Sequence, residues 1–279
     1  MGFFSSSSSK APALERPVLD LSGPALTAAT ERLAAACEET GGVEAYVEAL
    51  RLKGEAFRKI FAEAGPGGPS AEEFTVLAGL MPTVRRRIGD WLEGDKFATL
   101  RKAVMELVGA KHDELLVDQR IAEFCVQFPQ GKRYRWVKDL AGELLHALDP
   151  ERYPLMCRWV WDTGSNTGVL REIWHGDVDR VSIRVSDGYA THVMLREELS
   201  QFLAGNGVFR DTLLYVDLLM AQVYSEYIAA QGGSYLRADF TAAEDAVAYL
   251  RRLLGLDGVR IKHNDRAVAQ AARAALPGL

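Results

Sequence analysis

The sequence predicts a mainly α-helical fold, a multi-helix orthogonal or bundle-like domain of about ten helices with one small β-hairpin near residues 178–193. Apolar residues recur at the three-to-four-residue spacing of a helix along most of the chain, and glycine and proline interrupt that spacing at short intervals. A strand-like alternation stands out in one stretch alone. With 279 residues, 48% of them hydrophobic, the chain is long enough to bury a full core.

The N-terminal part divides at its glycines and serines. Residues 1–20 are Ser- and Pro-bearing without periodicity, which predicts a mobile tail. A helix follows from about Ser22 to the Gly41-Gly42 pair, and a second spans about 43–64, before a Gly-Pro-rich break. Ser70 and Glu73 have the spacing of a capping box, which predicts the start of the next helix.

Further helices are expected, in order, at about 83–92, 95–110, 114–128 and 134–148, then 195–204, 210–231, 241–254 and 265–275. Asp149-Pro150 is typical of a helix N-terminus, and Thr241–Glu244 has a second capping-box pattern. Residues 210–231 are apolar nearly all round, which predicts a central buried helix packed on Trp159, Trp161 and Trp174. We expect one domain over 21–279; the alternative is two packed halves, 21–128 and 132–279.

The composition changes between Ala147 and Ala190, where 42 residues contain no alanine. Residues 178–185 alternate between apolar and polar side chains, and Asp187-Gly188 is a typical hairpin turn before 189–193. These two features predict the hairpin.

Composition excludes several classes of function. A net charge of −5 gives no general attraction to nucleic acid, and no apolar run is long enough to span a bilayer. The three cysteines form no C-x-x-C pair, which favours a reducing, cytoplasmic location. The excess of arginine over lysine, 24 to 9, is typical of a bacterial source. No nucleotide-binding, zinc-protease or hydrolase motif occurs, and we expect no cofactor.

Asp162-Thr163-Gly164-Ser165 resembles the catalytic turn of aspartic proteases. That mechanism requires two carboxylates that share a proton, whereas this chain has one such turn in a helical setting. The alternative is a polar loop in which glycines supply the turn conformation. Asp162 is therefore a candidate catalytic residue of an enzyme site in the 162–192 region.

His175, Asp177 and Asp179 alternate at the start of the expected strand. Alternate residues of a strand share a face, so the three side chains would lie together and could form an acid/base or divalent-metal site. His192, across the expected hairpin, is the further candidate ligand. The alternative is a solvated strand start with no ligand.

Two segments suggest macromolecular partners. Residues 132–138 alternate cations and aromatics, as single-stranded nucleic-acid sites do, through Lys132, Arg133 and Arg135; the alternative is an ordinary helix start. Residues 152–174 hold the arginines and tryptophans that dominate protein interfaces, namely Arg152, Arg158, Trp159, Trp161, Arg171 and Trp174.

Asp217 lies within the apolar 210–231 helix, where an unpaired carboxylate is costly. We expect it to pair with an arginine such as Arg158 or Arg171. We favour a non-catalytic regulatory protein that contacts an unidentified partner protein through residues 152–174. The alternatives are the enzyme at 162–192 and a nucleic-acid-binding protein.

Overall fold

The computed structural model describes residues 14–176, 182–230 and 246–257, and these form α-helices joined by turns and short 3-10 segments. The mainly α class is therefore confirmed. The helices are α1 Gly23–Cys37, α2 Val43–Ala64, α3 Ala71–Gly79, α4 Gly94–Gly109, α5 Val117–Val126, α6 Trp136–Leu148, α7 Val169–Glu172, α8 Tyr189–Gly205, α9 Thr212–Ala230 and α10 Ala246–Leu253.

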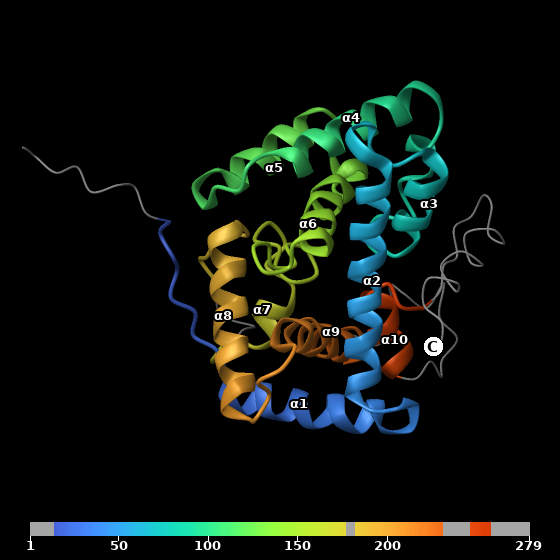
Figure 1. Ribbon diagram of the computed structural model, residues 1–279. Helices are drawn as coiled ribbons and strands as arrows, with labels where there is room; N and C mark the ends of the chain where they lie inside the picture. The colour runs from blue at the N-terminus through green and yellow to red at the C-terminus, as the bar shows by residue number, and fades with distance from the viewer. Residues whose placement is uncertain (1–13, 177–181, 231–245, 258–279) are drawn as a thin grey trace, which may run out of the picture.

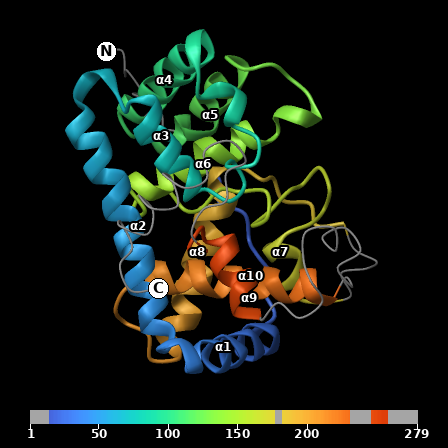
Figure 2. The same ribbon diagram turned by 90° about the vertical axis from the view of Figure 1, so that its right-hand side faces the viewer.

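The helices lie in two groups connected by the long helix α2 (Figure 1; Figure 2). Helices α3 to α6 form one group, and α1 lies with α7 to α10 in the other. Helix α2 runs along both, and it contacts α6 in the first group and α1 and α9 in the second. The grouping does not follow chain order, because the first helix packs with the last ones.

Helix α9 is the central element of its group. It contacts α1, α2, α7, α8 and α10, and every residue from Val216 to Val223 is buried. The predicted central helix is confirmed. Trp159 packs on it as expected, with its ring 5.7 Å from that of Tyr224.

Local sequence signals account for several helix ends. The capping box is present at the start of α3, where the Ser70 Oγ accepts the Glu73 N–H and Glu73 accepts the Ser70 N–H. Two expected helices are not formed. Residues 83–92 make turns and a 3-10 segment, Gly89–Trp91, and Asp149-Pro150 begins a single turn, because Pro154 soon forces the backbone to be extended.

The predicted β-hairpin is wrong: within the described residues there is no strand, and the second expected strand is the first turn of α8. Asp187-Gly188 leads into a helix because Asp118, on α5, accepts the N–H of Tyr189 at 2.8 Å. Residues 182–186 belong to no helix or strand. Instead, the Val185 carbonyl accepts hydrogen bonds from the Trp161 and Thr163 side chains.

Some predictions fall outside the described residues. These are residues 1–13 of the expected tail, the capping box at 241–244 and the helix at 265–275. Residues 14–20 pack on the body: Leu19 is buried, Arg16 pairs with Glu197 at 2.8 Å, and the Asp20 carbonyl accepts the His175 N–H.

Candidate functional site

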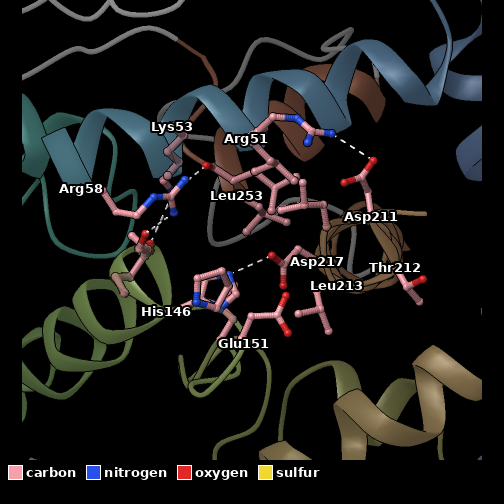
Figure 3. A pocket seen from close by; sticks show the side chains of 18 of the residues that line it. Arg51, Lys53, Arg58, His146, Glu151, Asp211, Thr212, Leu213, Asp217 and Leu253 are labelled. Carbon is pink, nitrogen blue, oxygen red and sulfur yellow. Dashed lines mark hydrogen bonds and ion pairs between the residues drawn. The ribbon is translucent and has the colours of Figure 1, made fainter. Parts of the chain in front are cut away.

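A cavity of about 420 Å³ lies between α2, α6, α9 and the end of α10 (Figure 3). Its wall combines six leucines with charged side chains from three of these elements. The leucines are Leu50, Leu155, Leu213, Leu214, Leu253 and Leu254; the ionisable residues are Arg51, Lys53, Arg58, Glu143, His146, Glu151, Asp211 and Asp217.

One charged pair of the cavity wall joins α6 to α9. His146 Nε2 lies 2.9 Å from Asp217 Oδ2, and His146 Nδ1 lies 2.9 Å from the Tyr153 carbonyl oxygen. Both ring nitrogens face acceptors, so the arrangement requires a proton on each nitrogen. Burial works against a charged imidazole, but the Asp217 carboxylate and the two hydrogen bonds outweigh it and raise the pKa of His146. The contacts and the raised pKa both favour the imidazolium form of His146.

The prediction that Asp217 is a buried acid with a partner is confirmed, but its partner is a histidine and not an arginine. Arg158 pairs instead with Asp139 on α6, whose carboxylate accepts from its Nε, Nη2 and backbone N–H at 2.8–3.0 Å. Arg171 lies 3.6 Å from Glu172. The half-buried Arg158 thus pairs with the buried carboxylate of Asp139.

Lys53 brings a second buried charge to the cavity from α2. Its Nζ donates to the Leu254 carbonyl at 2.9 Å and lies 3.5 Å from Glu143 Oε2. Burial raises the pKa of Glu143, although Lys53 opposes that shift. Lys53 on α2 therefore holds the C-terminal end of α10 in place. A cation is favoured at that end by the helix dipole.

The mouth of the cavity is formed by the loop before α9. Asp211 has a left-handed φ of 52°, a conformation that is uncommon for residues other than glycine, and its carboxylate binds Arg51 Nη2 at 3.0 Å. Phe209 lines the cavity yet is 78% exposed. The Arg51–Asp211 pair thus fixes the loop that carries this aromatic ring.

Arg58 and Glu151 complete the charged wall and lie on either side of the His146 ring in the view of Figure 3. The Arg58 guanidinium folds back over Gly54 and donates to the Ala147 carbonyl in a weak bond of 3.4 Å. Gly54 leaves room for this position, because a Cβ there would lie 3.0 Å from Arg58 Nη1, close enough for the guanidinium to have to shift by a few tenths of an ångström.

A smaller cavity of about 10 Å³ lies behind the His146–Asp217 pair, with room for about one water. His192 lines it from α8. The Nδ1 of His192 donates to the Gly188 carbonyl at 2.9 Å, and its buried Nε2 has no partner among the described residues. Burial lowers the pKa of His192, so this imidazole is neutral.

The predicted enzyme site at 162–192 is only partly described. Asp162 closes a local turn, in which its Oδ1 accepts from the N–H groups of Gly164 and Ser165. His175 is exposed, and His192 is buried in α8. Asp177 and Asp179 lie outside the described residues. In the part of the chain that is described, no group of three or more His, Cys, Asp or Glu residues is placed to hold a metal ion.

In the two segments proposed to contact nucleic acid (132–138) and a partner protein (152–174), several cations are exposed and most of the tryptophan rings are buried. Lys132, Arg133 and Arg135 are exposed, and Arg133 lies 3.5 Å from Asp90, whereas Trp136 is buried. In residues 152–174, Trp159 and Trp161 are buried core residues; Arg152 is exposed and pairs with Asp149, and Trp174 is half-buried.

Sequence reasoning missed Lys53, Glu143 and His146. A signal existed for Lys53, which stands three residues after Leu50 and four before Phe57, on the buried stripe of α2. Glu143 likewise follows Leu140 by three residues on α6. A charged residue on an apolar helical stripe is the pattern that identifies both.

Comparisons of the chain with protein-family models, curated proteins and solved structures give no match. Among the helices that the structure describes, none is long and apolar enough to cross a membrane. The cavity is therefore the feature of the structure from which a function is proposed.

Proposed function

We propose that this chain binds a small organic molecule in the cavity between α2, α6, α9 and α10, and does so without transforming it. The observation that carries the proposal is the convergence of six leucines and two buried ion pairs on one cavity of about 420 Å³. Ligand sites have this volume and this combination of an apolar wall with a few placed polar groups.

Binding is favoured over catalysis by the way the ionisable groups are used. A general base needs a lone pair directed at the substrate, whereas both nitrogens of His146 face protein acceptors. Lys53 donates to the Leu254 carbonyl, and the Thr212 hydroxyl lies within bonding distance of the Val208 carbonyl. These groups shape the cavity and hold its helices together.

The partner-protein hypothesis for residues 152–174 stays a prediction. Trp159 and Trp161 no longer support it, because both are buried in the core and cannot contact a partner. A partner that used this segment would meet Arg152 and Trp174 first. We therefore place the small-molecule proposal ahead of it.

The test is an unbiased binding experiment. The purified protein is equilibrated with a small-molecule extract of bacterial cells, separated from unbound material, and its ligand identified by mass spectrometry after denaturation. We expect one compound at near-equal stoichiometry and chemically unchanged. Leu50→Trp, which fills the cavity, abolishes this retention, whereas Leu116→Trp, at a side chain that is 49% exposed and outside the cavity, preserves it.

Two outcomes contradict the proposal. If wild type retains no more of any compound than Leu50→Trp does, the cavity is not a binding site. If the bound compound is recovered as a reaction product, the protein is an enzyme. Circular dichroism of both variants checks that each is folded before the comparison is made.

A further inference from the structure

We infer that the ligand is an aliphatic zwitterion, an amino acid or short peptide with leucine-like side chains, whose carboxylate binds Arg58 and whose ammonium binds Glu151. The inference rests on the proposed function and adds the chemical class of the ligand and the two residues that select it.

The charge balance of the cavity wall is the first argument. Four cations and four acids line it, and three pairs form among them: Arg51 with Asp211, Lys53 with Glu143, and His146 with Asp217. One cation and one acid are left. Arg58 and Glu151 are both exposed. Within the described residues, no acidic side chain pairs with Arg58 and no basic side chain pairs with the Glu151 carboxylate, although Arg196 Nη1 donates to the Glu151 backbone carbonyl at 2.9 Å. A ligand with one positive and one negative charge would pair with Glu151 and Arg58, respectively.

The surroundings of Arg58 suit a carboxylate. Its guanidinium presents several N–H donors in a planar fork that matches two carboxylate oxygens, and the weak 3.4 Å bond to the Ala147 carbonyl leaves most of them available. The guanidinium lies close to Gly54, where a Cβ would be 3.0 Å from Nη1. Because Gly weakens a helix interior, its presence in the middle of α2 agrees with a requirement for space beside the guanidinium.

The surroundings of Glu151 suit an ammonium. Glu151 follows the C-terminus of α6, which ends at Leu148 and carries the negative end of the helix dipole. The carboxylate and the dipole therefore act together on a cation. Figure 3 shows Glu151 on the same side of the His146 ring as Asp217, away from Arg58.

Apart from its charged groups, the cavity wall is largely aliphatic. All six of its leucines offer branched, flexible surface, and Phe209 stands at the mouth. A ligand with one charge alone would cover Arg58 or Glu151 with apolar surface and give it no partner, and burying an unpaired charge is costly. This cost is what discriminates the zwitterion from its singly charged analogues.

The test is isothermal titration calorimetry with four probes. Leucine and leucyl-leucine carry both charges, 4-methylpentanoate lacks the ammonium, and 3-methylbutylamine lacks the carboxylate. We expect at least one zwitterion to bind, and each analogue to bind about tenfold more weakly or worse, as follows from losing a hydrogen bond to a charged group.

Variants assign the two ends. Arg58→Gln and Glu151→Gln are each expected to weaken zwitterion binding by about tenfold or more, and Arg58→Lys to recover part of the loss. The matched controls Lys59→Gln and Glu63→Gln, on exposed side chains of the same helix α2 and outside the cavity, leave binding unchanged.

Each contrary result has a separate meaning. If 4-methylpentanoate or the amine binds as tightly as the zwitterions, or if no probe binds while the cell extract yields a different ligand, the inference fails and the proposed function stands. If zwitterions bind but neither glutamine variant weakens them, Arg58 and Glu151 are not the selecting residues. If neither the probes nor the extract bind, both proposals fail.

Discussion

The buried imidazolium of His146 depends on one carboxylate. Burial by itself favours the neutral ring, and Asp217, 2.9 Å away, reverses this. The ion pair links the last turn of α6 to the middle of α9, so its protonation is linked to folding.

Replacing Asp217 by Asn makes the loss of stability depend on pH. The folded-state pKa of His146 is raised above its ordinary 6.5, so the stability it contributes is present below about pH 6.5 and is lost as the pH rises through the folded-state pKa. We expect Asp217→Asn to cost about 3 kcal/mol at pH 6, and less at higher pH. Urea unfolding between pH 6 and 9 measures the difference.

The matched control is Asp139→Asn, which breaks the buried pair with Arg158. Arginine does not titrate in this range, so the stability difference from wild type should stay constant between pH 6 and 9. A difference for Asp217→Asn that is equally constant would contradict an imidazolium at His146.

A second residue-scale prediction separates stability from binding at Gly54. Gly54→Ala should raise the free energy of unfolding by up to about 1 kcal/mol, because alanine is the better helix former. The new Cβ would lie 3.0 Å from Arg58 Nη1, so the guanidinium must move by a few tenths of an ångström, and we expect ligand binding to weaken. Thermal unfolding and calorimetry on the same sample measure both; a variant that binds as wild type does would show that binding does not depend on the space left by Gly54.

At the scale of the element, α8 begins where a residue distant in the sequence supplies its first acceptor. Asp118 on α5 accepts the N–H of Tyr189, and Gly188 has no side chain to block it, as a Cβ there would lie 2.7 Å from Asp118 Oδ2. This contact has the role that a capping residue has within a helix.

Asp118→Ala should therefore destabilise the protein by about 1–2 kcal/mol, the effect of losing a helix cap. Glu123→Ala, an exposed position on the same helix, should change it by less than about 0.5 kcal/mol. Chemical denaturation of both variants makes the comparison. Equal effects would mean that the helix start does not depend on this carboxylate.

This contact also explains how far the fold follows from local sequence. The bounds of α2 and the capping box of α3 were predictable, because apolar spacing and capping act within a few residues. The region 178–193 was not, because Asp187-Gly188 suits a hairpin turn and a helix start equally, and Asp118 decides between them from 71 residues away.

The candidate site shows the same division. Asp217 was predictable as a buried acid from its apolar helix, but its partner depends on how α6 packs against α9. His146 has no local signal, since it stands near a helix end where charged and polar residues are common. Lys53 and Glu143 were detectable from the buried stripes of their helices.

At the scale of the whole molecule, α2 joins the two groups of helices, and we expect them to unfold as one cooperative unit. It buries Tyr46 and Phe57 in the core and contacts helices of both groups. Tryptophans report on each group, with Trp91 and Trp136 in one and Trp159 and Trp161 in the other.

Phe57→Ala should lower the free energy of unfolding by about 3–5 kcal/mol, because Phe57 is fully buried. The unfolding transitions measured by tryptophan fluorescence and by circular dichroism should shift together and remain coincident. Separate transitions, in wild type or variant, would show that the groups unfold independently despite α2.

The small cavity behind Asp217 places two imidazoles in opposite charge states within one wall. His146 holds a proton on each nitrogen, and neutral His192 holds its single proton on Nδ1. In a nitrogen-15 NMR spectrum at pH 6, His146 should give two signals of the protonated type, and His192 one protonated and one unprotonated signal. His192 and Asp217 line the same small cavity, and the Nε2 of His192 has no hydrogen-bond partner among the described residues. We therefore expect the Nε2 resonance to change when a molecule bound in the larger cavity moves Asp217.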